Sequence, residues 1–395
     1  MTSEQAGIRR EILLSGRIRR IVVKLGSGTV TDESLGLREA TIRGLAAQVA
    51  ALGETRGIEV VVVTSGAVAA GRRKMGMADK PRTVALKQAA AAVGQTTLMR
   101  AYERAFEKRG RKVGQLLLTH EDFENRERYV NARNTIETLL SRGIVPIINE
   151  NDTVATEEIR LGDNDHLASL VTQLVAADLL LLLTDSDGLY TKDPHRHPDA
   201  RLIPVVARID DDVLRSAGGL RRRSAGTGGM ASKLSAARLV SAWGTPVVIA
   251  SGLSRRTIAD VLAGRAVGTI VLPSARGKGR SRKMWIAYAR HPHGTIAVDD
   301  GARKVLLERG KSLLPAGIVG VTGKFGRGDA VSIGDRKGRV FARGIAAWSN
   351  EQVERGMGKK SAEIRAILGE DVPPEVVHRD DLTILRGAGG GHSST

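Results

Sequence analysis

The sequence predicts an α/β fold, in which an open, mainly parallel sheet is covered by helices on both faces and is followed by a small C-terminal β-rich domain. Six short runs of β-branched residues and leucine punctuate the first 275 residues, and such runs are typical of buried parallel strands. Stretches with apolar residues at every third or fourth position separate several of these runs and predict helices. Strand and helix therefore alternate, which implies right-handed βαβ crossovers.

Glycine and polar residues follow the predicted strands at their carboxyl ends. The stretches 37–54 and 85–110 have the apolar spacing of helices and lie between strands. In an open parallel sheet, ligands bind beyond the carboxyl ends of the strands, so we expect these strand ends to form one site. The strand runs are IVVKLG from Ile21, EVVVVTSG from Glu59, VGQLLLT from Val113, IVPIINEND from Ile144, LLLLLTDSDG from Leu179 and TPVVIASG from Thr245.

The length of 395 residues exceeds what one hydrophobic core usually supports and suits two domains. The basic, glycine-containing stretch SARGKGRSRK that follows Pro273 predicts an exposed linker. Turn signals such as HPHG, DDG and GRGD then predict a small β domain. The expected parts are an N-terminal tail (1–16), an α/β domain (17–275), a basic linker (276–284), a β-rich domain (285–371) and a C-terminal tail (372–395) that is disordered at its end.

Composition excludes several classes of protein. The chain has no run of about 18 apolar residues and no apolar core of a signal peptide, so we expect a cytoplasmic protein with no membrane partner. It contains no cysteine, which excludes disulfides, thiolate nucleophiles and cysteine metal sites. Its histidines form no HExxH or catalytic-triad pattern, and we assign them no role.

The formal net charge of +18 suggests nucleic-acid binding, because clustered lysine and arginine attract phosphate backbones. Basic residues are densest from Arg276 to Arg343. Solvated basic faces explain the same charge, and only 3% of the residues are aromatic and able to stack on bases. Composition alone leaves both interpretations open.

The segment GTGGMASK, from Gly226 to Lys233, predicts a phosphate-binding loop. Its glycines let backbone N–H groups approach phosphate oxygens, the helix expected after it adds a favourable dipole, and Lys233 adds a point charge. A dinucleotide fingerprint is excluded because no strand immediately precedes the segment. A Walker A loop is absent, since Val305 stands where its first glycine should be. The alternative is a flexible glycine loop without a ligand.

Other polar residues at strand ends suit anionic ligands. Lys24 ends the first strand and is placed to reach a phosphate, although a solvated lysine is the alternative. Ser65 follows the second strand and offers a hydroxyl group beside backbone donors. Thr184 begins TDSDG, where a nucleotide contact competes with a simple turn.

The segments NEND and LGDND place carboxylates and amides on neighbouring loops. Such a cluster is unfavourable unless cations or ammonium groups balance its charge. Asp152 and Asn164 are therefore candidates for binding a substrate amino group, and Asp165 for orienting the lysines. An exposed acidic turn is the alternative.

Together these segments resemble the amino acid kinase family, and within it the glutamate 5-kinases of proline biosynthesis. VVKLGS, TSGAVAAG, INENDTV, GDND, LLTDSDGLY and GTGGMASK occur in that family's order, and the resemblance extends from about Arg19 to Gly369. The segment from Gly294 to Asp329 resembles a PUA domain, a small β fold often found in RNA-modifying proteins. The resemblance implies an amino acid kinase fold followed by a PUA-like domain.

The resemblance also implies roles for single residues. Lys24 and Lys233 would neutralise the transferred phosphoryl group, and Asp165 would hold the two lysines in position. The residues that would bind glutamate are Ser65, Asp152 and Asn164, and those that would bind ATP are Lys24, Thr184, Asp185, Thr227, Gly228, Gly229, Met230, Ala231, Ser232 and Lys233.

The reaction implied by the resemblance moves the γ-phosphoryl group of ATP to the side-chain carboxylate of L-glutamate, giving L-glutamyl 5-phosphate and ADP. A carboxylate nucleophile needs no general base, which agrees with a site made of lysines and backbone amides. Mg²⁺ would accompany ATP and be held mainly by phosphates and water, without dedicated protein ligands. The resemblance further implies a homo-oligomer, feedback inhibition by proline and transfer of the product to glutamyl phosphate reductase. RNA binding by the PUA-like domain is expected only as an accessory activity.

Overall fold

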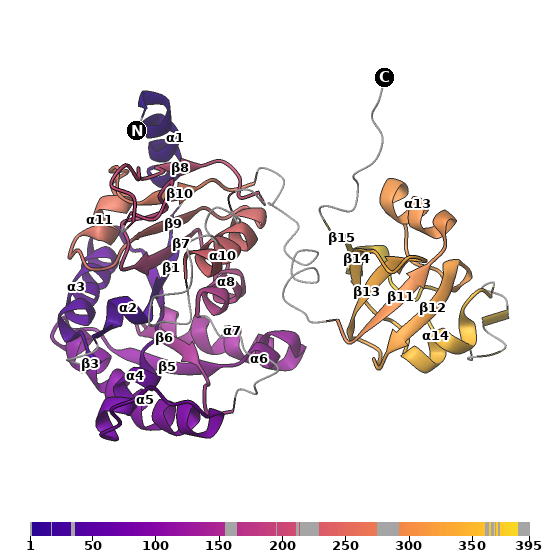
Figure 1. Ribbon diagram of the computed structural model, residues 1–395, viewed down its shortest axis with the longest axis horizontal. Coiled ribbons are helices and arrows are strands. Elements are labelled where there is room, and N and C mark those ends of the chain that lie inside the picture. Colours follow the sequence, from indigo (N-terminus) through magenta and orange to yellow (C-terminus); the bar gives the residue numbers. More distant parts are fainter. Residues whose placement is uncertain are drawn as a thin grey trace. The chain divides into compact units, whose positions relative to one another are not determined.

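The computed structural model divides the chain into two compact units, Met1–Lys278 and Gly279–Thr395, and each is described by itself (Figure 1). The predicted domain limits stay predictions, and the predicted linker 276–284 lies outside the described residues. The structure describes residues 2–16, 18–32, 36–154, 164–194, 196–210, 213, 229–274, 292–359, 363–364, 367, 369 and 372–385.

The first unit is built on an eight-stranded sheet with the order β5-β6-β4-β1-β7-β9-β10-β8 (Figure 1). The six predicted strands form the parallel part, from β5 to β9. Two short strands complete the sheet in the opposite direction, because β10 is antiparallel to β9 and parallel to β8. The predicted open, mainly parallel sheet is confirmed. The strands are β1 (Arg20–Leu25), β4 (Glu59–Val63), β5 (Val113–Leu118), β6 (Val145–Glu150), β7 (Leu179–Thr184), β8 (Val205–Val206), β9 (Val247–Ser251) and β10 (Thr269–Val271).

Helices cover both faces of this sheet. The side chains of Ile21 and Val23 in β1 belong to a core shared with the first group of helices, whereas α8 contacts β1 and β7 from the other face and packs against α10. The first group is α1 (Ser3–Leu13), α3 (Glu39–Arg56), α5 (Val84–Glu107) and α11 (Thr257–Leu262), and the second includes α7 (Arg126–Ser141), α8 (Asn164–Leu174) and α10 (Met230–Ala242). Short elements between them are α2 (Ser27–Val30), β2 (Thr31–Asp32), β3 (Gly36–Leu37), α4 (Ala67–Lys74) and α6 (His120–Glu124).

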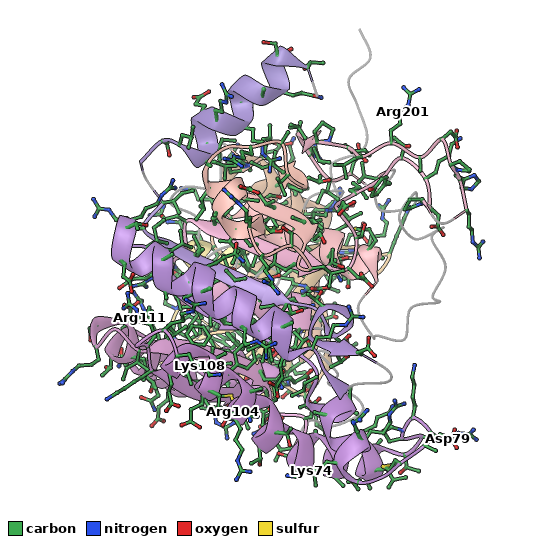
Figure 2. All side chains as sticks on the ribbon, turned by 90° about the vertical axis from the view of Figure 1, so that its left-hand side faces the viewer. Lys74, Asp79, Arg104, Lys108, Arg111 and Arg201 are labelled. Carbon is green, nitrogen blue, oxygen red and sulfur yellow. The ribbon has the colours of Figure 1, made fainter. Side chains whose placement is uncertain are left out.

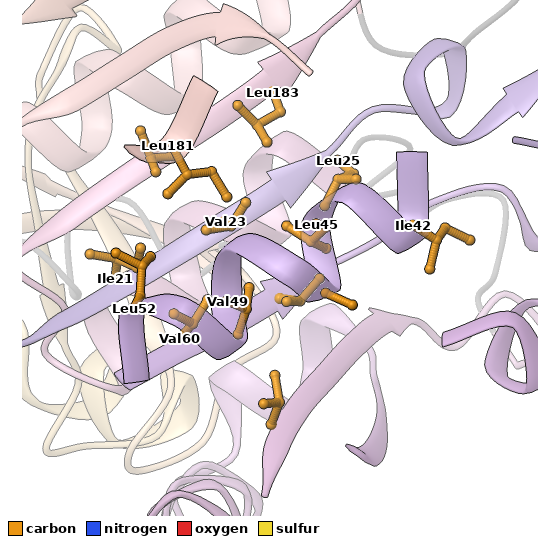
Figure 3. Packing of buried hydrophobic residues seen from close by; sticks show 14 of the residues in the cluster. Ile21, Val23, Leu25, Ile42, Leu45, Val49, Leu52, Val60, Leu181 and Leu183 are labelled. Carbon is orange, nitrogen blue, oxygen red and sulfur yellow. The ribbon is translucent and has the colours of Figure 1, made fainter. Parts of the chain in front are cut away.

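The helix α3 shows how the sequence produces this packing (Figure 3). Its apolar residues Ile42, Leu45, Val49 and Leu52 recur at helical spacing, so they share one face and are all buried against the sheet. Full burial of each such side chain stabilises the fold by roughly 1.5 to 3 kcal/mol. The helix ends at Arg56 and is followed by Gly57, which adopts the left-handed conformation with φ 61° that favours glycine.

The helices α4 and α5 touch backbone to backbone. A Cβ atom built on Gly71 would lie 1.7 Å from the carbonyl oxygen of Ala90, and one on Gly94 would lie 1.8 Å from that of Ala67. Only glycine allows this approach, which fixes the first turn of α4 directly after Ser65. Lys74 and Arg104 are exposed on the outer side of the pair (Figure 2), and Arg104 forms an ion pair with Glu39 of α3 at 3.5 Å.

The segment 1–16, predicted as a tail, contains the helix α1, which Thr2 caps at its N-terminus. Leu13 joins the hydrophobic core, and the fully buried guanidinium of Arg9 donates hydrogen bonds to the carbonyls of Gly268, at 3.3 Å, and Val267. Burial lowers the pKa of Arg9 to about 10. The helix is therefore packed onto the α/β unit. Within the described residues, no helix has the length and apolarity to cross a membrane.

The second unit is a five-stranded sheet with the order β12-β11-β13-β14-β15 and a core of its own, which confirms the predicted β-rich domain. Trp348 and Phe341 are among its largest buried side chains. Val376 and Val377 are buried, so part of the predicted C-terminal tail belongs to this core. Its elements are β11 (Gly294–Val298), α13 (Asp300–Arg309), η2 (Pro315–Gly317), β12 (Ile318–Gly323), β13 (Ala330–Asp335), β14 (Val340–Ile345), α14 (Asn350–Gly356), η3 (Arg379–Asp381) and β15 (Leu382–Ile384).

Candidate active site

A buried cluster of charged residues lies beyond the carboxyl ends of the parallel strands. The carboxylate of Asp165 accepts hydrogen bonds from Lys24 at Oδ1 and from Lys233 at Oδ2, the second at 3.2 Å. The hydroxyl of Ser232 donates to Oδ2 of the same carboxylate at 2.8 Å. Lys24 is 3% exposed, Lys233 4% and Asp165 not at all. One carboxylate thus holds two ammonium groups in a nearly solvent-free position.

The elements of the sheet bring these residues together from distant parts of the chain. Lys24 points to the α8 face of β1, because alternate residues of a strand face opposite sides. Asp165 lies in the first turn of α8, and Lys233 lies in the first turn of α10. A carboxylate in the first turn of a helix is stabilised by the helix dipole. The packing of α8 against α10 therefore places Asp165 between the two lysines.

Burial and the two neighbouring lysines act in opposite directions on the pKa of Asp165. Burial by itself would raise the pKa of Asp165, but the charges of Lys24 and Lys233 and hydrogen bonds from Lys24 and Ser232 outweigh it and lower the pKa to about 2. Asp165 is therefore ionised at neutral pH. Two ammonium groups facing one carboxylate leave an excess positive charge, which suits an anionic ligand.

A second group of polar residues adjoins the cluster. Nδ2 of Asn164 donates a hydrogen bond to Oγ of Ser65 at 2.9 Å, while Oδ1 of Asn164 is buried and has no hydrogen-bond partner among the described residues. Asp152 is partly buried, and burial raises its pKa to about 6. Within the part of the chain that the structure describes, no cation pairs with Asp152. These groups offer acceptors and a carboxylate to a ligand that brings its own positive charge.

A third group surrounds the end of β7. The hydroxyl of Thr184 donates to Oδ1 of Asp185 at 2.9 Å, and the side chain of Asp185 lies against Gly28 of α2. A Cβ atom on Gly28 would lie 3.0 Å from Oδ2 of Asp185, so the absence of a side chain there makes room for this carboxylate. The end of β7 and the start of α2 thus meet beside Lys24.

The glycine loop is described only in part. Gly229 caps the N-terminus of α10, and Met230, Ala231, Ser232 and Lys233 form its first turn. The predicted contacts at Thr227 and Gly228 lie outside the described residues. α10 is the helix predicted after the loop, and its first turn carries Ser232 and Lys233, which both bind Asp165. The N-terminus of a helix favours phosphate.

Two features of the site were not found from the sequence. Ser232 was predicted as one member of an ATP loop, but its hydrogen bond to Asp165 makes it part of the charged cluster. Asn149 at the end of β6 donates to Oε1 of Gln95 in α5 at 2.9 Å, and Gln95 carried no signal beyond being a polar residue in a helix rich in alanine. No group of three His, Asp or Glu side chains suited to a metal ion occurs among the described residues.

Comparisons with known proteins identify the family to which the chain belongs. The model of the amino acid kinase family matches residues 19–251, and that of the PUA domain matches residues 294–368. A protein of Citrifermentans bemidjiense named glutamate 5-kinase is 50% identical over 378 residues, which cover 96% of this chain and 100% of that protein. One from a Geobacter species has the same identity and coverage. The glutamate 5-kinase of Geobacter sulfurreducens is 49% identical over 369 residues, 93% of this chain and 98% of that protein. The chain therefore belongs to the amino acid kinase family and, within it, to the glutamate 5-kinases, and it carries a C-terminal PUA domain.

Proposed function

We propose that this kinase transfers the γ-phosphoryl group of ATP to the side-chain carboxylate of L-glutamate. A carboxylate oxygen attacks the γ-phosphorus, the bond from that phosphorus to the bridging oxygen of the β-phosphate breaks, and the products are L-glutamyl 5-phosphate and ADP. No proton has to be removed from the nucleophile. The observation that carries the proposal is the buried cluster in which one carboxylate, Asp165, holds Lys24 and Lys233.

The two lysines address the main obstacle to this reaction, which is repulsion between an anionic nucleophile and an anionic phosphate. Preorganised positive charges in a dry site stabilise a transferring phosphoryl group far better than the same charges in water. Asp165 fixes both ammonium groups before the substrates bind, so little reorganisation is needed during transfer. Lys24, Lys233 and Asp165 are therefore the proposed catalytic residues.

The proposed glutamate site contains Ser65, Asp152 and Asn164. Asp152 carries a desolvated carboxylate that lacks a partner among the described residues, and the α-ammonium group of glutamate would supply one. The Ser65–Asn164 pair adds a hydroxyl and the unused Oδ1 of Asn164. The proposed ATP site comprises Lys24, Thr184, Asp185 and residues 227–233.

Mg²⁺ is proposed to enter with ATP. The described residues fit this role because they offer lysines and helix N-termini to the phosphates that would carry the ion. When bound, the ion would neutralise charge on the phosphate oxygens. Lys24 and Lys233 would hold the phosphates themselves.

The proposal is tested by trapping the acyl phosphate with hydroxylamine. L-glutamate, N-acetylglutamate and L-aspartate are offered in parallel with ATP and Mg²⁺, and hydroxamate is expected from L-glutamate alone. Hydroxamate formed only from N-acetylglutamate or only from aspartate would overturn the substrate assignment. Release of ADP without any hydroxamate would overturn the acyl-phosphate chemistry.

The family membership supports further proposals about context. We infer a cytoplasmic homo-oligomer that acts in proline biosynthesis, is inhibited by proline and passes its labile product to glutamyl phosphate reductase. RNA binding by the PUA domain is proposed only as an accessory activity. The test is to measure the affinity for a short RNA at several salt concentrations. The affinity falls steeply as salt rises if lysine and arginine contact the phosphates.

A further inference from the structure

A pocket of about 190 Å³ lies on the face of the first unit's sheet that α3 covers. Its buried wall includes Leu25 and Leu183, which are paired in the register of β1 and β7. Leu25 directly follows Lys24, and successive residues of a strand face opposite sides of the sheet. The pocket and the lysine cluster therefore lie on opposite faces of β1. None of the residues that line the pocket belongs to the proposed glutamate or ATP site.

The helix α3 forms one side of the pocket and contributes Gly44, a glycine in the interior of a helix. Glycine destabilises a helix interior relative to alanine, so its presence calls for a reason. Gly71 and Gly94 have one, because their Cβ atoms would collide with a neighbouring backbone. A Cβ atom on Gly44 would meet only Cγ of Arg255, at an ordinary 3.7 Å. What glycine provides at this position is the open space of the pocket.

The loop after β9 forms the other side of the pocket and brings a positive charge to its rim. The side chain of Arg255 lies over Gly44, and within the described part of the chain its guanidinium forms no ion pair or hydrogen bond. Its neighbour Arg256 differs, since it pairs with Asp260 at 3.7 Å. None of the described residues that line the pocket is acidic. The rim therefore has an unbalanced positive charge, which suits a carboxylate.

Leucine side chains form much of the wall. Leu25, Leu45 and Leu183 are almost completely buried, whereas Leu253 at the rim is 48% exposed. Covering this apolar surface with an apolar group of a ligand is favourable. A cavity of about 150 Å³ accommodates benzene, so this pocket has room for a ligand of about eight non-hydrogen atoms. The pocket fits a short branched chain that ends in one anionic group.

We propose that this pocket binds a small aliphatic monocarboxylate, as a ligand distinct from the substrates. The carboxylate pairs with the guanidinium of Arg255, and the aliphatic chain lies against Leu25, Leu183 and Leu253 in the space that Gly44 leaves open. An amino acid is disfavoured, because its ammonium group would find no carboxylate among the described lining residues. The inference goes beyond the proposed function and holds whichever carboxylate the enzyme phosphorylates.

The test measures binding of isocaproate to the full-length protein by ligand-observed NMR at neutral pH. This probe matches the pocket in size and carries one negative charge, and we expect a millimolar or lower Kd. Isohexanol has the same chain without the charge, and acetate has the charge without the chain. Both are expected to bind about tenfold more weakly or worse, because each loses either the charged hydrogen bonds or the buried methylene groups.

Three variants locate the site. Arg255→Met keeps the aliphatic stem over Gly44 and removes the charge, so the Kd for isocaproate should rise about tenfold or more. Gly44→Leu fills the pocket from α3 and should abolish binding, and circular dichroism checks that the fold persists. Arg256→Met is the matched control, since Arg256 does not line the pocket, and it should leave the Kd unchanged.

The lysine cluster is the competing site for a carboxylate, and Lys233→Ala separates the two. Isocaproate should bind this variant with wild-type affinity, and loss of binding there overturns the inference. Absence of binding to the wild-type protein also overturns it, as do equal affinities for isocaproate and isohexanol. The same holds if Arg255→Met and Arg256→Met bind isocaproate alike or if Gly44→Leu still binds it. None of these measurements uses turnover, so failure of the proposed function would leave them unchanged.

Discussion

Lys233 and Asp165 form an ion pair at 3.2 Å although 67 residues separate them in the chain, and both side chains are almost completely buried. Each lies in the first turn of its helix, so the packing of α8 against α10 sets the distance. Asp165 also forms an ion pair with Lys24, so the three residues make one cluster. Removal of one lysine leaves the ion pair with the other lysine in place.

Substitution of Lys233 by alanine is expected to separate catalysis from folding. Asp165 keeps Lys24 and Ser232 as partners, so the fold should persist, whereas the transferred phosphoryl group loses one of its two positive charges. We expect kcat to fall by at least about two orders of magnitude, as for loss of a preorganised electrostatic donor. Single-turnover kinetics and circular dichroism are the measurements, and near-normal turnover would remove the catalytic assignment.

Asp152 is expected to give the binding of glutamate a characteristic pH dependence. Burial raises the pKa of Asp152 to about 6 in the free protein, so its charge is lost as pH falls through 6. The KM for glutamate should rise below that pH, because the ammonium group then lacks its counter-charge. In Asp152→Asn this dependence should disappear, with a high KM at every pH and a nearly unchanged kcat.

The raised pKa of Asp152 also predicts that its carboxylate destabilises the folded protein at neutral pH. Folding raises the pKa of such a carboxyl group because its charged form is desolvated in the folded state. At any pH above the pKa that the group has in the unfolded chain, it therefore destabilises the folded state. Asp152→Asn should therefore raise the melting temperature at pH 7 and leave it unchanged near pH 3. A lower melting temperature at pH 7 would mean that Asp152 has a stabilising partner.

Gly28→Ala is expected to affect ATP and not glutamate. The new Cβ would lie 3.0 Å from Oδ2 of Asp185, so this carboxylate must move by a few tenths of an ångström away from its position beside Thr184. We expect the KM for ATP to rise several-fold while the KM for glutamate stays unchanged. Gly7→Ala, where no atom lies within 4 Å of the new Cβ, is the matched control and should have wild-type kinetics.

Gly71→Ala is expected to force α4 and α5 apart. Its Cβ would lie 1.7 Å from a backbone oxygen, which no side-chain movement can relieve. Overpacking of this kind should cost about 3 kcal/mol or more in the free energy of unfolding, measured in urea. Gly44→Ala in α3 is the control, because its Cβ meets Arg255 at an ordinary 3.7 Å, and helix propensity should stabilise it by up to about 1 kcal/mol. Equal stabilities of the two variants would contradict the backbone contact.

The sequence predicted those parts of the structure that depend on local pattern. The six parallel strands were visible because apolar runs such as that of β7 are buried on both faces, and α3 and α5 because their apolar residues keep helical spacing. The three-residue strand β10 and the helix α1 were not predicted. The first is too short for a pattern, and the second is held by Arg9, whose partners Val267 and Gly268 lie more than 250 residues away.

In the candidate site, too, residues within local motifs could be predicted, whereas contacts between distant segments could not. Motifs at a strand end and in two loops pointed to Lys24, Asp165 and Lys233. Their roles stay predictions, although the structure brings the three residues together. The pairing of Gln95 with Asn149 could not be predicted, because it depends on how α5 crosses β6 and not on either residue's neighbours in the chain. Ser232 was predicted as part of the glycine loop, but its hydrogen bond to Asp165 was not predicted.

The central position of β1 has a consequence for synthesis of the protein. Ribosomes make this strand early, yet its partner β7 extends to Thr184, so one edge of β1 stays unpaired until nearly half of the chain has been made. The apolar residues Val22 and Val23 have no complete cover during that interval. Unpaired edges and exposed apolar surface promote aggregation of nascent chains. The central position that buries Lys24 in the finished enzyme thus leaves one edge of β1 open during synthesis until β7 has been made.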